Sequence, residues 1–256
     1  MNRDAVRQWM NVLATLLTIV MNGLANALPL NGQLTGEISD RFKVFFVPAG
    51  YVFSIWGIIY LGLIVFSIYQ VLPAQRENPD LRKVGYFYVV SCVANIIWLF
   101  LWHYNIFLLT LVAMLAILYA LITIYQRLAI GKARPTVSMR MFVHLPFSIY
   151  LGWITVATIA NATSLLEFLG WNGWGIGPAV WAAIMLIAAV AISTLMSFTR
   201  GDIAYVVVLV WVFAGIAAKH WATPAVGMTA ILSALVVIVT LILGRLRLKG
   251  ARMRRS

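Results

Sequence analysis

The chain has 256 residues, of which 63% are hydrophobic and 10% are charged, and its formal net charge is +12. Soluble domains carry about 25% charged residues, so this composition excludes an ordinary soluble globular protein and predicts a membrane protein. The single cysteine, Cys92, excludes an intramolecular disulfide and a thiolate metal cluster.

Eight long apolar runs follow one another along the chain, each long enough, or nearly so, to cross about 30 Å of hydrocarbon as a helix. They are Trp9–Leu28, Pro48–Gln70, Val84–Trp102, Ile106–Gln126, Phe142–Thr163, Pro178–Phe198, Ile203–Ala218 and Pro224–Leu243. A spanning segment must satisfy its own backbone hydrogen bonds, and the runs lack the polar inner face of barrel strands. The predicted fold class is therefore all-α, a polytopic membrane helical bundle of about eight transmembrane helices.

Lys and Arg are distributed unevenly between the connections. Sixteen lie at the amino terminus, in the second, fourth and sixth connections and after the last run, whereas the remaining connections hold only Arg41, Lys43 and Lys219. The positive-inside rule then places both termini in the cytoplasm, which requires an even number of spans. We expect a multi-pass protein of a bacterial inner (cell) membrane.

The positive charge gathers at helix ends rather than on a folded basic surface, so we expect no nucleic-acid partner. Membrane lipid is the expected partner of these residues. The basic stretch Gly244–Arg255 is suited to anionic headgroups.

Amide side chains are concentrated in the first five runs. Asn22 and Asn26 lie one turn apart in the first run, Asn95 is in the third and Asn161 in the fifth, and no Asn or Gln follows Asn172. An unpaired amide in hydrocarbon costs several kcal/mol, so we expect these side chains to face other helices or a cavity.

The last three runs are aliphatic with scattered small residues, which is typical of packing helices. We predict a division in the loop Ser164–Gly177, where Trp171 and Trp174 are expected to form an interfacial aromatic belt. Residues 1–165 would form a five-helix ligand-binding bundle. Residues 166–256 would add three transmembrane helices and a basic cytoplasmic tail.

The runs contain no Asp, Glu, Lys or Arg, and their only His is His144. Ion-coupled transporters and proton pumps place ionisable residues inside the bundle, so no coupling site is predicted. Acid/base and nucleophile sets are missing too, so we predict no catalytic residue and regard an enzyme as the weaker interpretation. His103 and His144 without a carboxylate or thiol predict no metal site, and His103 is expected to cap a helix or face headgroups.

Four motifs recur in an order that resembles the TspO/MBR family, the tryptophan-rich sensory proteins related to the mitochondrial translocator protein. They are Pro48, Tyr51, Val52, Phe53, Trp56 and Tyr60 of the second helix, "LTGEISDRF" of the first loop, Asn95 and Trp98 of the third helix, and Tyr150, Leu151, Trp153, Ala157, Thr158 and Asn161 of the fifth. The resemblance covers roughly residues 9–165. The three further helices exceed the usual five-helix unit, so the chain resembles a longer branch of the family.

The chain departs from the family pattern at several positions. Tyr51 replaces a usual Trp, Ser91 stands where Gln is common, and the fifth-helix Pro is displaced to Pro146. The interval from Phe53 to Trp56 is one residue shorter, which on an ideal helix rotates Trp56 by about 100°. That rotation decides whether the ring faces a pocket or lipid.

The resemblance implies binding of porphyrins and other tetrapyrroles, of sterols in some members, and of synthetic aromatic ligands. Large ring faces beside amide groups suit such a broad, apolar ligand with polar edges. The predicted ligand-binding residues are Tyr51, Phe53, Trp56, Tyr60, Asn95, Trp98, Tyr150, Trp153, Ala157 and Asn161. The alternative is that these rings pack the bundle and the Asn side chains join helices. The loop Pro29–Val47 is either a lid, as the resemblance implies, or a solvated connection.

The predicted function is therefore binding of a hydrophobic planar ligand, a porphyrin or tetrapyrrole, in its sensing or handling. No cofactor is required. The alternatives are a transporter or exporter of such compounds and, on the resemblance alone, a porphyrin-degrading enzyme. A homodimer formed through the added helices is left open.

Overall fold

The computed structural model describes residues 3–253, apart from the side chain of Arg252, and every regular element in that range is helical. Arg254 and Arg255, counted above in the basic tail, lie outside the described residues. The long helices are α1 (Arg3–Ala27), α3 (Ile55–Val71), α5 (Phe87–His103), α6 (Phe107–Arg127), α8 (Leu145–Phe168), α9 (Pro178–Thr199), α10 (Ile203–Lys219) and α11 (Pro224–Met253). The predicted all-α class is confirmed.

The helices differ in whether they can cross a bilayer. Within residues 3–253, six are long and apolar enough, and α3 and α8 are counted there with the helical turns that precede them. The apolar helices α5 and α10 have 17 residues each, which extend about 26 Å at about 1.5 Å per residue. Because this is shorter than about 30 Å of hydrocarbon, the count of eight spans stays a prediction.

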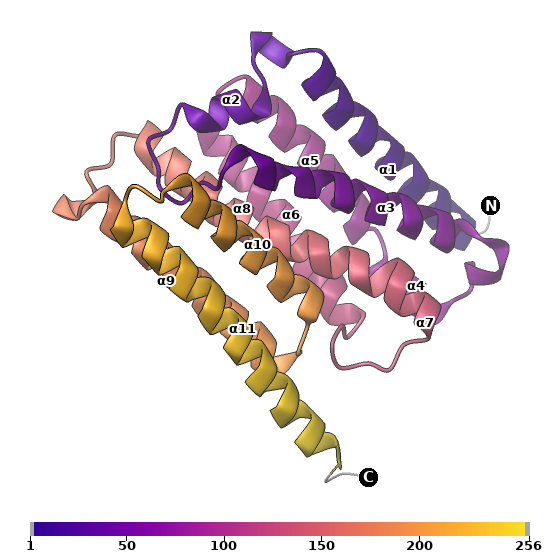
Figure 1. Ribbon diagram of the computed structural model, residues 1–256. Coiled ribbons are helices and arrows are strands. Elements are labelled where there is room, and N and C mark those ends of the chain that lie inside the picture. Colours follow the sequence, from indigo (N-terminus) through magenta and orange to yellow (C-terminus); the bar gives the residue numbers. More distant parts are fainter. Residues whose placement is uncertain (1–2, 254–256) are drawn as a thin grey trace.

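Five of the long helices form a ring. Each of α1, α3, α8, α6 and α5 packs against the next, and α5 closes the ring on α1. α10 packs on the outside of α8, and α9 and α11 pack against each other and against α10 (Figure 1). The ring comprises the helices assigned to the ligand-binding bundle, and the division at residue 165 stays a prediction.

Short elements connect the long helices, and the three between α1 and α3 cover one end of the ring. The short elements are η1 (Leu30–Gly32), α2 (Thr35–Asp40), η2 (Gly50–Ser54), η3 (Pro73–Gln75), α4 (Pro79–Val84), α7 (Val137–Met139), η4 (Arg140–His144) and η5 (Gly173–Gly175). α2 packs against α5, and η2 packs against both α3 and α10. The chain between α1 and α3 therefore lies over the end of the ring rather than standing free in solvent.

Glycine permits the close approach of α10. A Cβ at Gly152 of α8 would lie 3.0 Å from the Tyr205 carbonyl oxygen, and a Cβ at Gly215 of α10 would lie 3.1 Å from the Pro48 Cβ. Both approaches are tighter than ordinary van der Waals contact. The absence of a side chain at these two positions therefore seats α10 against the ring and against the loop before η2.

Buried amides join the helices, as predicted for most of them. The Asn22 amide donates to the Asn95 side-chain oxygen over 2.8 Å and so links α1 to α5, and both residues are buried. Asn26 differs, because its side chain is exposed and donates to the Asn22 carbonyl of its own helix. The prediction that Asn26 faces a helix or a cavity is wrong: its amide satisfies itself locally at the end of α1.

Candidate functional site

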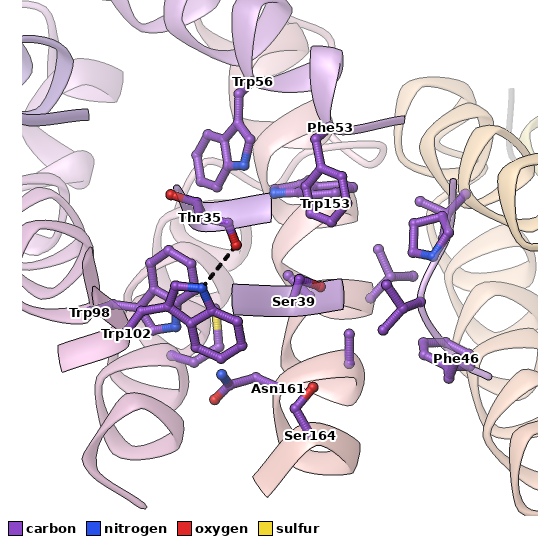
Figure 2. Close-up of a pocket in the computed structure, with 17 residues that line it drawn as sticks. Thr35, Ser39, Phe46, Phe53, Trp56, Trp98, Trp102, Trp153, Asn161 and Ser164 are labelled. Atoms are coloured by element: carbon purple, nitrogen blue, oxygen red, sulfur yellow. Dashed lines mark hydrogen bonds between the residues drawn. The ribbon is translucent and has the colours of Figure 1, made fainter. Parts of the chain in front are cut away.

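A cavity lies inside the ring, beneath α2 and the loop before η2. Its free volume is about 70 Å³. It is lined by Thr35, Ser39, Phe46, Val47, Pro48, Phe53, Trp56, Trp98, Trp102, Met114, Trp153, Val156, Ala157, Ala160, Asn161, Ser164 and Val212. Figure 2 shows the four indole rings and Phe53 around this space, with Phe46 at the opposite side from Trp98 and Trp102.

The rings form two groups. Trp153 packs edge-on against Phe53 and Trp56, with ring centroids 5.7 and 6.0 Å apart. Trp98 and Trp102 are stacked, with centroids 5.4 Å apart and planes 19° from parallel. Edge-on and stacked pairs are both favourable for aromatic side chains, so the rings support one another and present faces to the cavity.

The short interval between Phe53 and Trp56 is explained by the local backbone. Gly50–Ser54 is a 3₁₀ turn that leads directly into α3. A 3₁₀ helix has about 3.0 residues per turn, so side chains three apart share a face. Phe53 and Trp56 consequently both line the cavity, and the rotation expected on an ideal α-helix does not turn Trp56 to the lipid.

Two indole N–H groups of the cavity walls are unsatisfied. The Nε1 atoms of Trp98 and Trp153 are buried and have no hydrogen-bond partner among the described residues. The amide of Asn161 is already engaged, because it exchanges hydrogen bonds of 3.1 and 3.2 Å with the Thr110 hydroxyl. A buried donor without a partner costs about 1–3 kcal/mol, so a ligand with an acceptor oxygen or nitrogen would be favoured here.

The structure brings six of the predicted binding residues to the cavity and places two more, Tyr60 and Tyr150, against one of its rings. Lining it are Phe53, Trp56, Trp98, Trp153, Ala157 and Asn161. Tyr60 and Tyr150 do not line the cavity but contact the Trp56 ring, with ring centroids 5.4 and 6.1 Å away. These two tyrosines fix the orientation of Trp56 rather than line the space.

Tyr51 and Asn95 are held elsewhere. Tyr51 is 51% exposed, and its ring packs against Trp211 of α10. Asn95 accepts the hydrogen bond from Asn22 and does not line the cavity. In this structure both residues join helices or loops, which was the alternative left open for Asn95.

Several lining residues were not among those predicted from the sequence, and they include Trp102, Thr35, Phe46 and Val212. The sequence could have indicated Trp102, because it follows Trp98 by one helical turn and therefore shares its face. No sequence feature indicated Val212, because it lies on α10, a helix that was assigned to packing. The cavity wall thus draws on both predicted parts of the chain.

α2 closes the cavity as a cover tied to the end of α5. The Trp102 Nε1 donates to the Thr35 carbonyl over 3.2 Å, and Asn31 donates to the His103 carbonyl over 3.0 Å. On the far side, Lys219 forms an ion pair of 2.9 Å with Asp40. The loop Pro29–Val47 is therefore held over the cavity by hydrogen bonds and an ion pair, and it is not a freely solvated connection.

His103 belongs to this attachment. Its ring is fully buried, with Nδ1 2.8 Å from the Leu99 carbonyl and Nε2 3.3 Å from the Thr35 hydroxyl. Because a carbonyl only accepts, Nδ1 donates to Leu99, and in the neutral ring Nε2 then accepts from the Thr35 hydroxyl. The expectation that His103 faces headgroups is therefore wrong. Among the described residues, no three His, Cys, Asp or Glu side chains gather as metal ligands.

Comparison with protein families matches residues 8–243 to the family described as TSPO-like protein. The match extends through α10 and into α11, beyond the part of the chain that carries the motifs. Comparisons with curated proteins and with solved structures gave no match. The apolar helices and the family match together identify an integral membrane protein. The chain belongs to the family of TSPO-like proteins.

Proposed function

We propose that the protein binds a hydrophobic planar ligand of the tetrapyrrole class and serves in sensing or handling it. The ligand binds in the cavity lined by Trp56, Trp98, Trp102 and Trp153, which we call the tryptophan cavity. The observation that carries the proposal is the pair of buried, unpartnered N–H groups of Trp98 and Trp153 in an apolar wall. Flat ring faces favour a planar ligand, and the free donors favour acceptor groups at its edge, such as carboxylates. No cofactor is needed for binding.

Binding requires the cover to move. Pockets for small molecules have volumes of about 300–1,000 Å³, whereas the cavity holds about 70 Å³ of free space. The part of the wall that moves in this proposal consists of Thr35 and Ser39 of α2 and of the segment Phe46–Pro48. Displacement of α2 from the end of α5 enlarges the cavity and exposes the Trp98 and Trp102 rings. In this proposal the arrangement described above, with α2 bonded to the end of α5, is the closed one.

The proposed orientation follows from the charge asymmetry of the connections. Both termini lie in the cytoplasm of a bacterium, and α2 covers the cavity on the opposite, outer face. The ligand then arrives from the outer side of the inner membrane. Labelling of cysteines introduced one at a time at Glu37 and Arg134, in a Cys92→Ala background, tests this in intact cells. Only the Glu37 position is expected to be accessible to an impermeant reagent.

Titration with protoporphyrin IX tests the proposed ligand. The detergent-purified protein is expected to show saturable binding, followed by the absorbance of the porphyrin. Trp98→Phe and Trp153→Phe keep a ring but lose the N–H, so each is expected to weaken binding by about 2- to 12-fold. Trp174→Phe is the matched control, because Trp174 is 76% exposed and lies outside the cavity.

Binding without saturation would refute the tetrapyrrole proposal. Equal affinity in Trp98→Phe, Trp153→Phe and the control would show that the ligand does not bind in this cavity. Reconstituted vesicles separate a receptor from a transporter: a receptor binds protoporphyrin without net flux, whereas an exporter moves it across the membrane. A porphyrin-degrading enzyme would instead give new absorbance bands and a product that depends on Trp153.

A further inference from the structure

A second cavity lies at the opposite, basic end of the helices, with a volume of about 400 Å³. It is bordered by the α6–α8 connection, the α9–α10 turn and the last turns of α11. Its lining is Ile130, Gly131, Ala133, Pro135, Arg140, His144, Leu145, Ser148, Arg200, Gly201, Asp202, Ile203, Ala204, Arg245, Leu248 and Lys249. Every one of these segments belongs to the face that carries most of the Lys and Arg.

The wall of this cavity is organised by hydrogen bonds between its segments. Arg200 donates to the Ile130 carbonyl over 3.2 Å, and Arg245 donates to the Gly201 carbonyl over 2.9 Å. Gly201 has a φ of +62°, and a Cβ there would lie 3.3 Å from the Arg245 Cγ. The two guanidinium groups are therefore held at the cavity while part of their donor capacity stays available, because each guanidinium has five N–H donors.

The charges around the cavity do not balance. Four side chains are cationic, namely Arg140, Arg200, Arg245 and Lys249, and the one carboxylate is Asp202. Within residues 3–253, none of the four forms an ion pair with a carboxylate within 4.0 Å. The cavity consequently carries an excess of positive charge that no described side chain pairs.

Asp202 is occupied by other partners. Its Oδ2 accepts hydrogen bonds from the Tyr125 and Ser148 hydroxyls over 2.7 and 2.6 Å, and its Oδ1 accepts from the Tyr205 N–H over 3.3 Å. These bonds fix Asp202 as the cap of α10. They direct its oxygens toward the helix and toward Tyr125 and Ser148, so the carboxylate serves the fold and leaves the four cations to a ligand.

We propose that this cavity binds a phosphate group and that its membrane source is the headgroup of an anionic phospholipid. Arg side chains match the geometry of phosphate oxygens through paired N–H donors, and basic pockets between membrane helices on the cytoplasmic side bind such headgroups. Leu145, Ile203 and Leu248 supply an apolar border where the acyl chains of the lipid can continue toward the bilayer. The proposal is independent of the tryptophan cavity and of its ligand.

Thermal unfolding of the detergent-purified protein with added probes tests the site. Phosphatidylglycerol is expected to raise the unfolding midpoint saturably, whereas phosphatidylcholine, whose headgroup has no net charge, is not. Inorganic phosphate and glycerol phosphate distinguish the source. A saturable shift with these soluble probes at comparable concentration identifies a free phosphate compound as the occupant, and a shift with phosphatidylglycerol alone identifies the lipid.

The double variant Arg140→Gln/Lys249→Gln removes two exposed cations of the cavity for which no backbone hydrogen bond is described. It is expected to bind phosphatidylglycerol about 10- to 30-fold more weakly. The matched control, Arg134→Gln/Arg247→Gln, changes the net charge equally at exposed residues outside the cavity and is expected to bind as the wild type does. Equal weakening in both double variants, or no saturable shift with any phosphate probe, would overturn the proposal.

Discussion

The indole Nε1 of Trp102 donates a hydrogen bond of 3.2 Å to the backbone carbonyl of Thr35 and so joins the end of α5 to the cover of the tryptophan cavity. Trp102 also stacks on Trp98, whose own N–H is unpartnered among the described residues. One indole of the stacked pair therefore holds the cover, and the other is available to a ligand.

Trp102→Phe is expected to loosen α2. The ring and its stacking on Trp98 are retained, but one hydrogen bond of about 0.5–1.5 kcal/mol is lost. Amide hydrogen exchange within residues 34–41 is expected to accelerate by about 2- to 12-fold. Trp221→Phe, at a 75% exposed position, is the control. Unchanged exchange in Trp102→Phe would show that this bond does not hold the cover closed.

Asn95→Leu is expected to destabilise the ring without altering ligand affinity. The Asn22 amide donates to both the Thr18 carbonyl and the Asn95 side-chain oxygen. The variant therefore leaves one buried N–H of Asn22 without an acceptor, at a cost of about 1–3 kcal/mol. Adding Asn22→Leu removes the stranded donor and is expected to recover part of the loss. Thermal unfolding in detergent measures both changes. A large fall in protoporphyrin affinity with an unchanged midpoint would instead assign Asn95 to the ligand.

Ala157→Leu is expected to fill the free space of the tryptophan cavity. The three added carbon atoms occupy much of the roughly 70 Å³ and obstruct the rings even when the cover opens. We expect protoporphyrin binding to weaken by at least about tenfold, with a change in unfolding free energy of about 1–3 kcal/mol from overpacking. Ala162→Leu, on the same helix but outside the cavity lining, is the control. Wild-type affinity in Ala157→Leu would place the ligand elsewhere.

His220 is expected to make stability depend on pH. Burial, and secondarily the neighbouring Lys219, lower the pKa of His220 below its ordinary value of 6.5, against the opposing effect of its contact with the Val47 carbonyl. The unfolded chain therefore binds the proton more readily. The stabilising contribution is fully present above about pH 6.5 and is lost as the pH falls toward the lowered pKa.

The unfolding midpoint of the wild type is accordingly expected to decrease between pH 7.5 and 5.5. His220→Gln is expected to reduce this dependence, because Gln keeps a donor for the Val47 carbonyl and does not titrate. Lys132→Gln, which removes an exposed charge on another connection, is the control and is expected to keep the full dependence. Identical pH profiles for all three proteins would exclude His220 as the titrating group.

The helices could be predicted from the sequence because they depend on local features. A backbone in hydrocarbon satisfies its hydrogen bonds within a helix, so each apolar run produced a helix in its predicted region, although Ile55 begins α3 seven residues after Pro48. The motifs around Trp98 and Trp153 likewise indicated an aromatic interior and the family. They did not indicate that Phe53 and Trp56 share a face, since that depends on the 3₁₀ turn before α3.

The site itself was decided by contacts between distant segments. Whether an amide or indole is free for a ligand depends on the partner across the ring, so Asn95 is used by Asn22 whereas the Trp153 N–H stays unpartnered among the described residues. Val212 reaches the cavity because Gly152 lets α10 approach α8 closely. The sequence by itself determined the helices and the kinds of side chain inside them, because hydrophobicity and backbone satisfaction act locally. The tertiary structure decided which polar groups are paired and how much space remains, because pairing and packing require the partner segment to be in place.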